Sequence, residues 1–130
     1  MPNVTQLVLS LESKPGVLAN IGGILAKAGI NIEGLCTGET TGGRGKIRLL
    51  VADPVAAEAA LKAAKIRCGR EEALKLTLEN RPGALAEAAQ RLAQARINVK
   101  CAYATASGAG QAVAVLTVAN AQRALAVLGG

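Results

Sequence analysis

The stretch LVLSLESKPGVLANIGGILAKAGINI, residues 7–32, decides the fold, because it recurs without a gap as LKLTLENRPGALAEAAQRLAQARINV, residues 74–99. The same offset lays RGKIRLLVAD, residues 44–53, on QAVAVLTVAN, residues 111–120. Roughly a third of the aligned positions are identical, which indicates an internal duplication. We therefore predict two copies of one module, at residues 1–70 and 71–130.

Each copy begins with a strand pattern followed by a helix pattern. In the first copy, leucines at every second position predict a half-buried strand, and Pro-Gly then breaks the pattern. Apolar residues next recur at helical spacing, which predicts a three-turn helix with one apolar stripe. Gly29 and Arg96 stand where these helices end. The strand leucines are Leu7, Leu9, Leu11, Leu74, Leu76 and Leu78, and the helical stripes are Leu18, Ile21, Leu25, Ala28 and Leu85, Ala88, Leu92, Ala95.

The remaining elements also follow in the same order in both copies. Second strands start at Asn31 and at Asn98, and each ends in a glycine-rich turn before a third strand. Second helices are predicted over residues 54–64 and 121–128, with Pro54 at the first turn, where its missing N–H is tolerated. In the first copy a short fourth strand, residues 66–69, completes the order strand, helix, strand, strand, helix, strand.

This order is typical of a ferredoxin-like βαββαβ module, an α+β architecture with an antiparallel sheet and both helices on one face. We expect two such modules in tandem, paired side by side. The second copy stops before the residue that would match Ile66, so it is truncated before its last strand. Its first strand should then have an open edge unless another segment or another chain pairs with it, and we expect dimerisation or strand exchange.

Composition excludes several classes of chemistry. The 130 residues contain no histidine, which removes Ser-His and Cys-His nucleophile pairs, His-ligated zinc and imidazole proton transfer. Cys36, Cys68 and Cys101 are too widely spaced for a CxxC pair and too few for a disulfide framework. We therefore expect free, mostly buried thiols, no metal site and no cofactor, and the common classes of enzyme are excluded although enzymes as such are not.

Charge and hydropathy restrict the partners. The net charge of +6 is dispersed along the chain, and one tyrosine is the only aromatic residue, so stacking platforms for nucleic acid are absent and no nucleic-acid partner is expected. No apolar run is long enough for a signal peptide or a membrane span. These features predict a cytoplasmic protein without a membrane partner.

A candidate ligand site lies between the first strand and the first helix of each copy. In ESKPGVLA, residues 12–19, and ENRPGALA, residues 79–86, proline fixes φ and glycine removes the Cβ. A tight turn would leave the helix N-terminal amides accessible to a carboxylate. Asn31 and Asn98, expected near the exit of the first strand, could orient an ammonium group. Alternatively, Pro-Gly only turns the chain and each asparagine only caps a turn.

The succession of an alternating strand, PGxLA, a helix and INI or INV resembles the ACT domain, a small regulatory module. The duplicated chain is similar to stand-alone tandem-ACT proteins of bacteria. The resemblance implies pairing of modules into an eight-stranded sheet and binding of a free amino acid at the interface between modules. The implied ligand contacts are Ser13, Lys14, Pro15, Gly16, Val17, Leu18, Asn31 and Ile32 in the first copy, and Asn80, Arg81, Pro82, Gly83, Ala84, Leu85, Asn98 and Val99 in the second.

On this resemblance we expect a non-catalytic, allosteric amino-acid sensor that forms a homodimer. The second site is expected to be the tighter one, because Asn80 and Asn98 can both form hydrogen bonds. One alternative is a detached regulatory subunit of an amino-acid biosynthetic enzyme, similar to that of acetolactate synthase, with a separate catalytic partner. Another is an RNA-binding module of the same fold.

Overall fold

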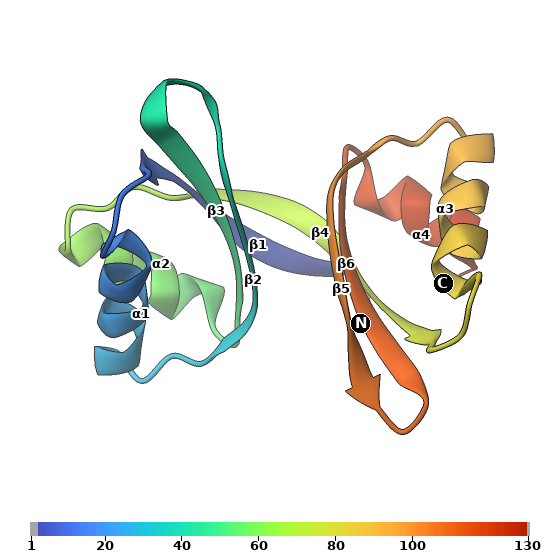
Figure 1. Ribbon diagram of the computed structural model, residues 1–130, viewed down its shortest axis with the longest axis horizontal. Helices are drawn as coiled ribbons and strands as arrows, with labels where there is room; N and C mark the ends of the chain where they lie inside the picture. Colours follow the sequence, from blue (N-terminus) through green and yellow to red (C-terminus); the bar gives the residue numbers. More distant parts are fainter. Residues whose placement is uncertain (1–2, 130) are drawn as a thin grey trace. The chain divides into compact units, whose positions relative to one another are not determined.

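The computed structural model describes residues 3–129 and divides into two compact units (Figure 1). Residues 5–71 form the first unit, called module 1 below, and residues 3–4 with 72–129 form the second, called module 2. In each module both helices cover one face of the strands, as the sequence predicted. The bounds 1–70 and 71–130 remain a prediction about independently folding units.

Module 1 is a four-stranded antiparallel sheet under two helices. Its strand order is β2-β3-β1-β4, and β1 and β4 continue beyond the module. β1 pairs with β3 from Leu7 opposite Leu49 to Glu12 opposite Arg44. Its elements are β1 (Asn3–Glu12), α1 (Val17–Lys27), β2 (Ile32–Glu39), a 3-10 turn η1 (Thr41–Gly43), β3 (Arg44–Val51), α2 (Pro54–Ala63) and the start of β4 (Gly69–Glu79).

Module 2 repeats this arrangement, but the first residues of β1 supply its outer strand. Its order is β1-β4-β6-β5, in which β1 contributes residues 3–4 beside β4. Within residues 3–129 no strand follows α4, so the second copy lacks a last strand of its own, as predicted. Its other elements are α3 (Ala84–Gln94), β5 (Val99–Gly108), β6 (Gln111–Val118) and α4 (Ala121–Leu128).

The predicted separate strand at residues 66–69 was wrong. Lys65 has a left-handed φ of 64°, and the Ile66 amide donates to the Leu61 carbonyl at 2.9 Å, so residues 66–68 close α2 instead of pairing. The strand begins at Gly69 and continues through Glu79 as one element of 11 residues. Because β1 and β4 each contribute residues to both modules, residues 3–129 contain six strands and not the eight that the family resemblance implied.

A polar cluster holds the first residues of β4 in module 1. The Glu71 carboxylate accepts from the Arg48 Nε of β3 at 2.6 Å and from the Gln6 Nε2 of β1 at 3.4 Å. Gln6 is fully buried, so its amide must have hydrogen-bond partners to avoid a desolvation cost. Glu71 thus ties three neighbouring strands together.

The duplication extends to helix capping. The side chains of Asp53 and Asn120 each accept a hydrogen bond at 3.0 Å, from the amides of Ala56 and Arg123, and cap α2 and α4. The C-termini of α1 and α3 are also alike. Gly29 and Arg96, which follow these helices, adopt left-handed φ angles of 73° and 59°. Arg96 thus adopts the conformation that glycine provides in the first copy.

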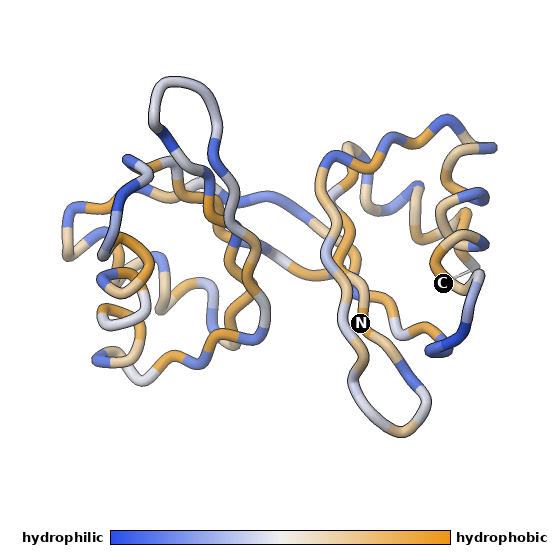
Figure 2. The backbone as a smooth tube through the Cα atoms, in the orientation of Figure 1, coloured by the Kyte–Doolittle hydropathy of each residue, from blue (hydrophilic) through white to orange (hydrophobic). Residues whose placement is uncertain are grey.

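Small aliphatic side chains fill both cores, and Figure 2 shows apolar residues along the central strands of each module. Leu7, Leu9 and Leu25 are fully buried in module 1, as is Leu74 in module 2. The predicted helical stripes were wrong at several positions. Leu18 and Leu85 remain 47% and 48% exposed, because a side chain in the first turn points towards the helix N-terminus and over the loop. Ala28, the C-cap residue of α1, is exposed and Ala95 is half-buried.

We expect Leu25→Ala and Leu18→Ala to differ strongly in stability although both change the same face of α1. Leu25→Ala leaves a cavity in the core and should lower the free energy of unfolding by about 2–5 kcal/mol. Leu18→Ala, the control, should cost less than about 1 kcal/mol because its side chain is already half in water. Urea unfolding measures both values, and equal losses would contradict the assigned core.

Candidate functional site

The two Pro-Gly loops have the same backbone geometry. Each begins with a hydrogen bond to the neighbouring hairpin, from the Ser13 amide to the Gly43 carbonyl at 2.8 Å and from the Asn80 amide to the Gly110 carbonyl at 2.9 Å. Gly16 and Gly83 then adopt left-handed φ angles of 91° and 89° as the N-cap residues of α1 and α3. The conformation requires glycine, since a Cβ at positive φ crowds the backbone.

Neither helix receives a side-chain cap, so backbone donors remain accessible. The Val17 amide donates to the Lys14 carbonyl at 3.4 Å, and the Asn20 amide donates to the Gly16 carbonyl at 2.9 Å. Among residues 3–129, no main-chain carbonyl accepts a hydrogen bond from the amide of Leu18 or Ala19. The second loop is equivalent, with Ala84 and Glu87 bonded in the same way. Both helix N-termini can therefore accept an anion.

Charges near the loops differ between the modules. In module 1, the Lys14 Nζ is 3.1 Å from the Glu12 Oε2, and both side chains are mostly exposed. In module 2, the Arg81 guanidinium contacts the Glu79 Oε2 at 2.6 Å and the Glu87 Oε2 at 2.7 Å. Hydrogen bonds to Glu87, and secondly to Glu79, raise the pKa of Arg81 above its ordinary value. An acid therefore stands in the first turn of α3, where α1 has the uncharged Asn20.

Asn31 and Asn98 do not approach these loops within their own modules, and our expectation that they lie near the first strand's exit was wrong. β1 ends at Glu12 opposite Arg44, whereas β2 begins at Ile32 opposite Val51. Seven residues of β3 separate these positions, which corresponds to about 23 Å along the strand. Because β1 and β2 are both antiparallel to β3, they are parallel to each other, and the start of one cannot meet the end of the other.

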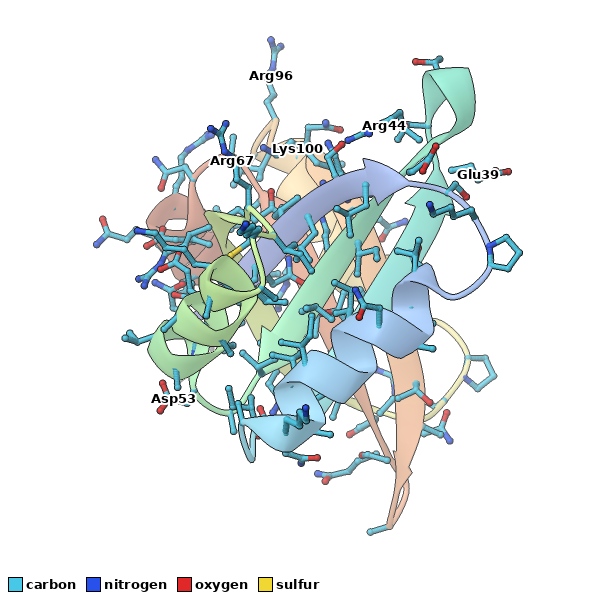
Figure 3. All side chains as sticks on the ribbon, turned by 90° about the vertical axis from the view of Figure 1, so that its left-hand side faces the viewer. Glu39, Arg44, Asp53, Arg67, Arg96 and Lys100 are labelled. Carbon is cyan, nitrogen blue, oxygen red and sulfur yellow. The ribbon has the colours of Figure 1, made fainter. Side chains whose placement is uncertain are left out.

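Module 2 has the same separation, since β4 ends at Glu79 opposite Gln111 and β5 begins at Val99 opposite Val118. Three of the residues labelled in Figure 3 mark the two ends of module 1, with Glu39 and Arg44 at one end and Asp53 at the other. The Asn31 carbonyl accepts from the Ala52 amide at 3.2 Å, next to Asp53.

The other predicted contacts divide into two groups. Residues of the loops lie together at one end of each module, and these are Ser13, Lys14, Pro15, Gly16, Val17 and Leu18, and Asn80, Arg81, Pro82, Gly83, Ala84 and Leu85. Ile32 and Val99 lie at the opposite ends, where both pack against the cores. Hence a small ligand bound to one module can contact the Pro-Gly loop or the asparagine, but not both.

The sequence interpretation missed the hairpin that supports each loop. Gly45 of β3 is buried, and a Cβ there would lie 3.5 Å from the Ser13 Cβ and from the Gly38 carbonyl oxygen. The Arg44 Nη2 also donates to the Ser10 carbonyl at 2.9 Å, so the hairpin is tied to β1. The glycine-rich turns at matching places in both copies could have indicated this hairpin contact, but we interpreted them only as turns.

The chain also contains three cysteines and an ion pair between Glu58 and Arg70. Cys36, Cys68 and Cys101 are all half-buried. Burial, followed by the charge of Glu58, raises the pKa of the Cys68 thiol, which disfavours the thiolate. The Arg70 hydrogen bond lowers the pKa of Glu58, whose Oε1 is 2.8 Å from the Arg70 Nη2. In the described part of the chain, no three His, Cys, Asp or Glu residues cluster closely enough to hold a metal ion.

None of the helices within residues 3–129 combines the length and the apolar character that crossing a membrane would require.

A family model described as an ACT domain pair matches residues 2–128. The solved structure of protein BT0572 from Bacteroides thetaiotaomicron is similar, with a TM-score of 0.90 and 30% identity over 98% of this chain and 88% of that chain. No curated protein matches the sequence.

Regulatory subunits of aspartate kinase share the fold alone. The ligand-free subunit from Thermus thermophilus has a TM-score of 0.68 and 18% identity over 98% of this chain and 91% of that chain. The subunit from Thermus flavus has a TM-score of 0.68 and 19% identity over 99% and 92%.

Gly16→Ala should destabilise the protein, whereas Gly23→Ala in the same helix should stabilise it. Alanine at the positive φ of Gly16 costs about 1–2 kcal/mol. Gly23 lies inside α1, where a Cβ meets no atom within 4 Å, so alanine there should add about 0.5–1 kcal/mol by reducing the entropy of the unfolded chain. Thermal unfolding of both variants measures the pair, and a Gly16→Ala variant as stable as the parent would contradict the loop geometry.

Proposed function

The chain belongs to the family of ACT domain pairs, and from this premise we propose that it is a non-catalytic regulatory protein that binds a free amino acid at its Pro-Gly loops. The observation that carries the proposal is the repeated pairing of uncapped amides with an exposed leucine. Leu18 and Leu85 follow the two N-cap glycines and are 47% and 48% exposed. An α-carboxylate would accept from the amides, and an apolar side chain would pack on the leucine.

The ammonium group would be oriented by an asparagine from another module. A ligand that occupies the Gly16 loop is about 23 Å from Asn31 of the same module by strand rise, so that side chain cannot reach it. We propose that a second copy of the chain supplies the asparagine, and that the amino acid completes its site only in a dimer. Ligand occupancy would then shift the assembly by its difference in affinity for the two states, and a partner such as a catalytic chain would read that shift.

Charge at the helix N-termini favours module 1 as the tighter site, the reverse of our expectation from the asparagines. Glu87 places a carboxylate in the first turn of α3, where it competes with a ligand carboxylate for the same positive end of the helix. Glu87 also forms an ion pair at 2.7 Å with Arg81, the cation of this loop, so Arg81 is less available to a ligand carboxylate. In module 1 the equivalent residue is the uncharged Asn20, and Lys14 pairs with the exposed Glu12.

A thermal-shift screen of the twenty amino acids tests the proposed function. A ligand present at about 100 times its dissociation constant should add roughly 2.7 kcal/mol of stability. The double variant Asn31→Ala/Asn98→Ala should lose the response without melting earlier, since both side chains are exposed. Gln122→Ala, which removes an exposed amide from α4, is the control and should respond like the parent.

The proposed function fails if no amino acid at millimolar concentration raises the midpoint. If the double variant responds fully, the asparagines are wrongly assigned. Sedimentation of the liganded protein tests the second copy, because a responding chain that stays monomeric would contradict a dimeric site.

A reciprocal exchange between the modules tests the ranking of the two sites. Asn20→Glu should weaken ligand binding at module 1 by about two- to fivefold, since a helix-terminal charge is worth about 0.3–1 kcal/mol. Glu87→Asn should strengthen binding at module 2 by a similar factor and free Arg81. Isothermal titration calorimetry with the amino acid found in the screen measures both changes. Unchanged affinities in both variants would show that the helix N-termini do not bind the carboxylate.

A further inference from the structure

Module 2 contains an open groove where module 1 has packed core. The groove has a volume of about 1000 Å³ and lies between β4, the inward side of α3 and the end of α4. Its apolar lining consists of Leu76, Leu78, Ala84, Ala88 and Leu128. All of these residues belong to module 2, so the groove lies within one unit.

The duplication shows why the groove is open. Ala88 aligns with Ile21, which is 1% exposed in the core of module 1. Ala84 and Arg91 align with Val17 and Ile24, which also pack against that core. Two large aliphatic side chains have therefore been replaced by methyl groups and a third by a guanidinium that lies at the rim.

Module 1 closes the same region with the segment that follows α2. Ile66 and Cys68 pack against its core cluster after the helix ends at Ala63. In module 2, α4 ends at Leu128, and the described residues through Gly129 contain no counterpart of either side chain. Leu76 of the lining is thus half-buried, whereas its counterpart in module 1, Leu9, is fully buried.

Charge at the rim indicates an anionic ligand group. The Arg91 Nη1 donates one long hydrogen bond, to the Leu128 carbonyl at 3.4 Å. Within residues 3–129, neither Arg91 nor Lys75 forms an ion pair. The one acid of the lining, Glu87, is paired with Arg81 at 2.7 Å. Gln90 and Gln94 add amide donors beside Arg91.

From these features we propose that the groove binds an aliphatic monocarboxylate of medium chain length. The hydrocarbon chain lies on the apolar lining under Ala84 and Ala88, and the Arg91 guanidinium binds the carboxylate with charge-assisted hydrogen bonds. This site differs from the proposed amino-acid site, which uses the main-chain amides of the loop and the outward Leu85. It adds a second ligand class to the protein and does not depend on amino-acid binding.

Octanoate is the test ligand, with butanoate and octan-1-ol for comparison. Calorimetric titration of the full chain should show octanoate binding at least about tenfold more tightly than either, because butanoate covers less apolar surface and octanol lacks the charge. Ala88→Ile restores the residue of module 1 and should lower the octanoate affinity at least about tenfold by filling the groove. Ala89→Ile makes the same change at the next, exposed residue and should leave the affinity unaltered.

Two further variants keep the test decisive. Arg91→Gln should reduce octanoate binding to the level of octanol, because only the head-group interaction is lost. Ala84→Val fills the groove from another point of α3 and replaces Ala88→Ile if circular dichroism shows that the latter variant is unfolded. Octanoate binding that survives both filling variants would overturn the proposal, as would equal binding of octanoate and octanol by the parent.

Sedimentation tests whether a second copy of the chain, and not a carboxylate, occupies the groove. If the unliganded chain dimerises and Ala88→Ile abolishes that dimer, a second copy occupies the groove and the carboxylate proposal is wrong. The amino-acid response in the thermal-shift screen should persist in Ala88→Ile. A chain that loses octanoate but keeps the amino-acid response separates this site from the loops.

Discussion

The left-handed backbone at Gly16 and Gly83 is the constraint on which both modules depend. It reverses the chain between a strand and a helix within a few residues, so that the helix returns over the strand that precedes it. The same geometry has a chemical consequence, because glycine cannot cap a helix through a side chain and the first amides stay accessible. In our proposal one backbone conformation therefore serves both folding and ligand binding, and a change to the loop should affect both.

Strand direction imposes the second constraint. The antiparallel pairing of β3 with both neighbours places the Pro-Gly loop and the following asparagine at opposite ends of each module. A ligand that needs both groups must therefore involve more than one module. In our proposal this separation is the origin of regulation, since a small molecule that joins two copies changes the equilibrium between assembly states.

The two copies use the same backbone for different side chains. Capping by Asp53 and Asn120 is preserved, as are the loop hydrogen bonds, and these determine the fold. Side chains that face the interior at the first helix are not preserved, since Ile21 fills space that Ala88 leaves open. The shared backbone thus carries a filled core in module 1 and an open groove in module 2, which we propose as a binding surface.

The duplication, the order of elements and the family were predictable from the amino-acid sequence, because periodicity, Pro-Gly turns and helix caps are local and recur in both copies. The positions of the loops and the identities of Leu7, Leu9 and Leu25 as core residues followed from the same local rules. Tertiary structure alone decided that β4 is one strand from Gly69 to Glu79, that Leu18 is exposed, and that Asn31 lies at the far end from Gly16. These features depend on strand register and on which surfaces meet, and residues that are distant in sequence set both.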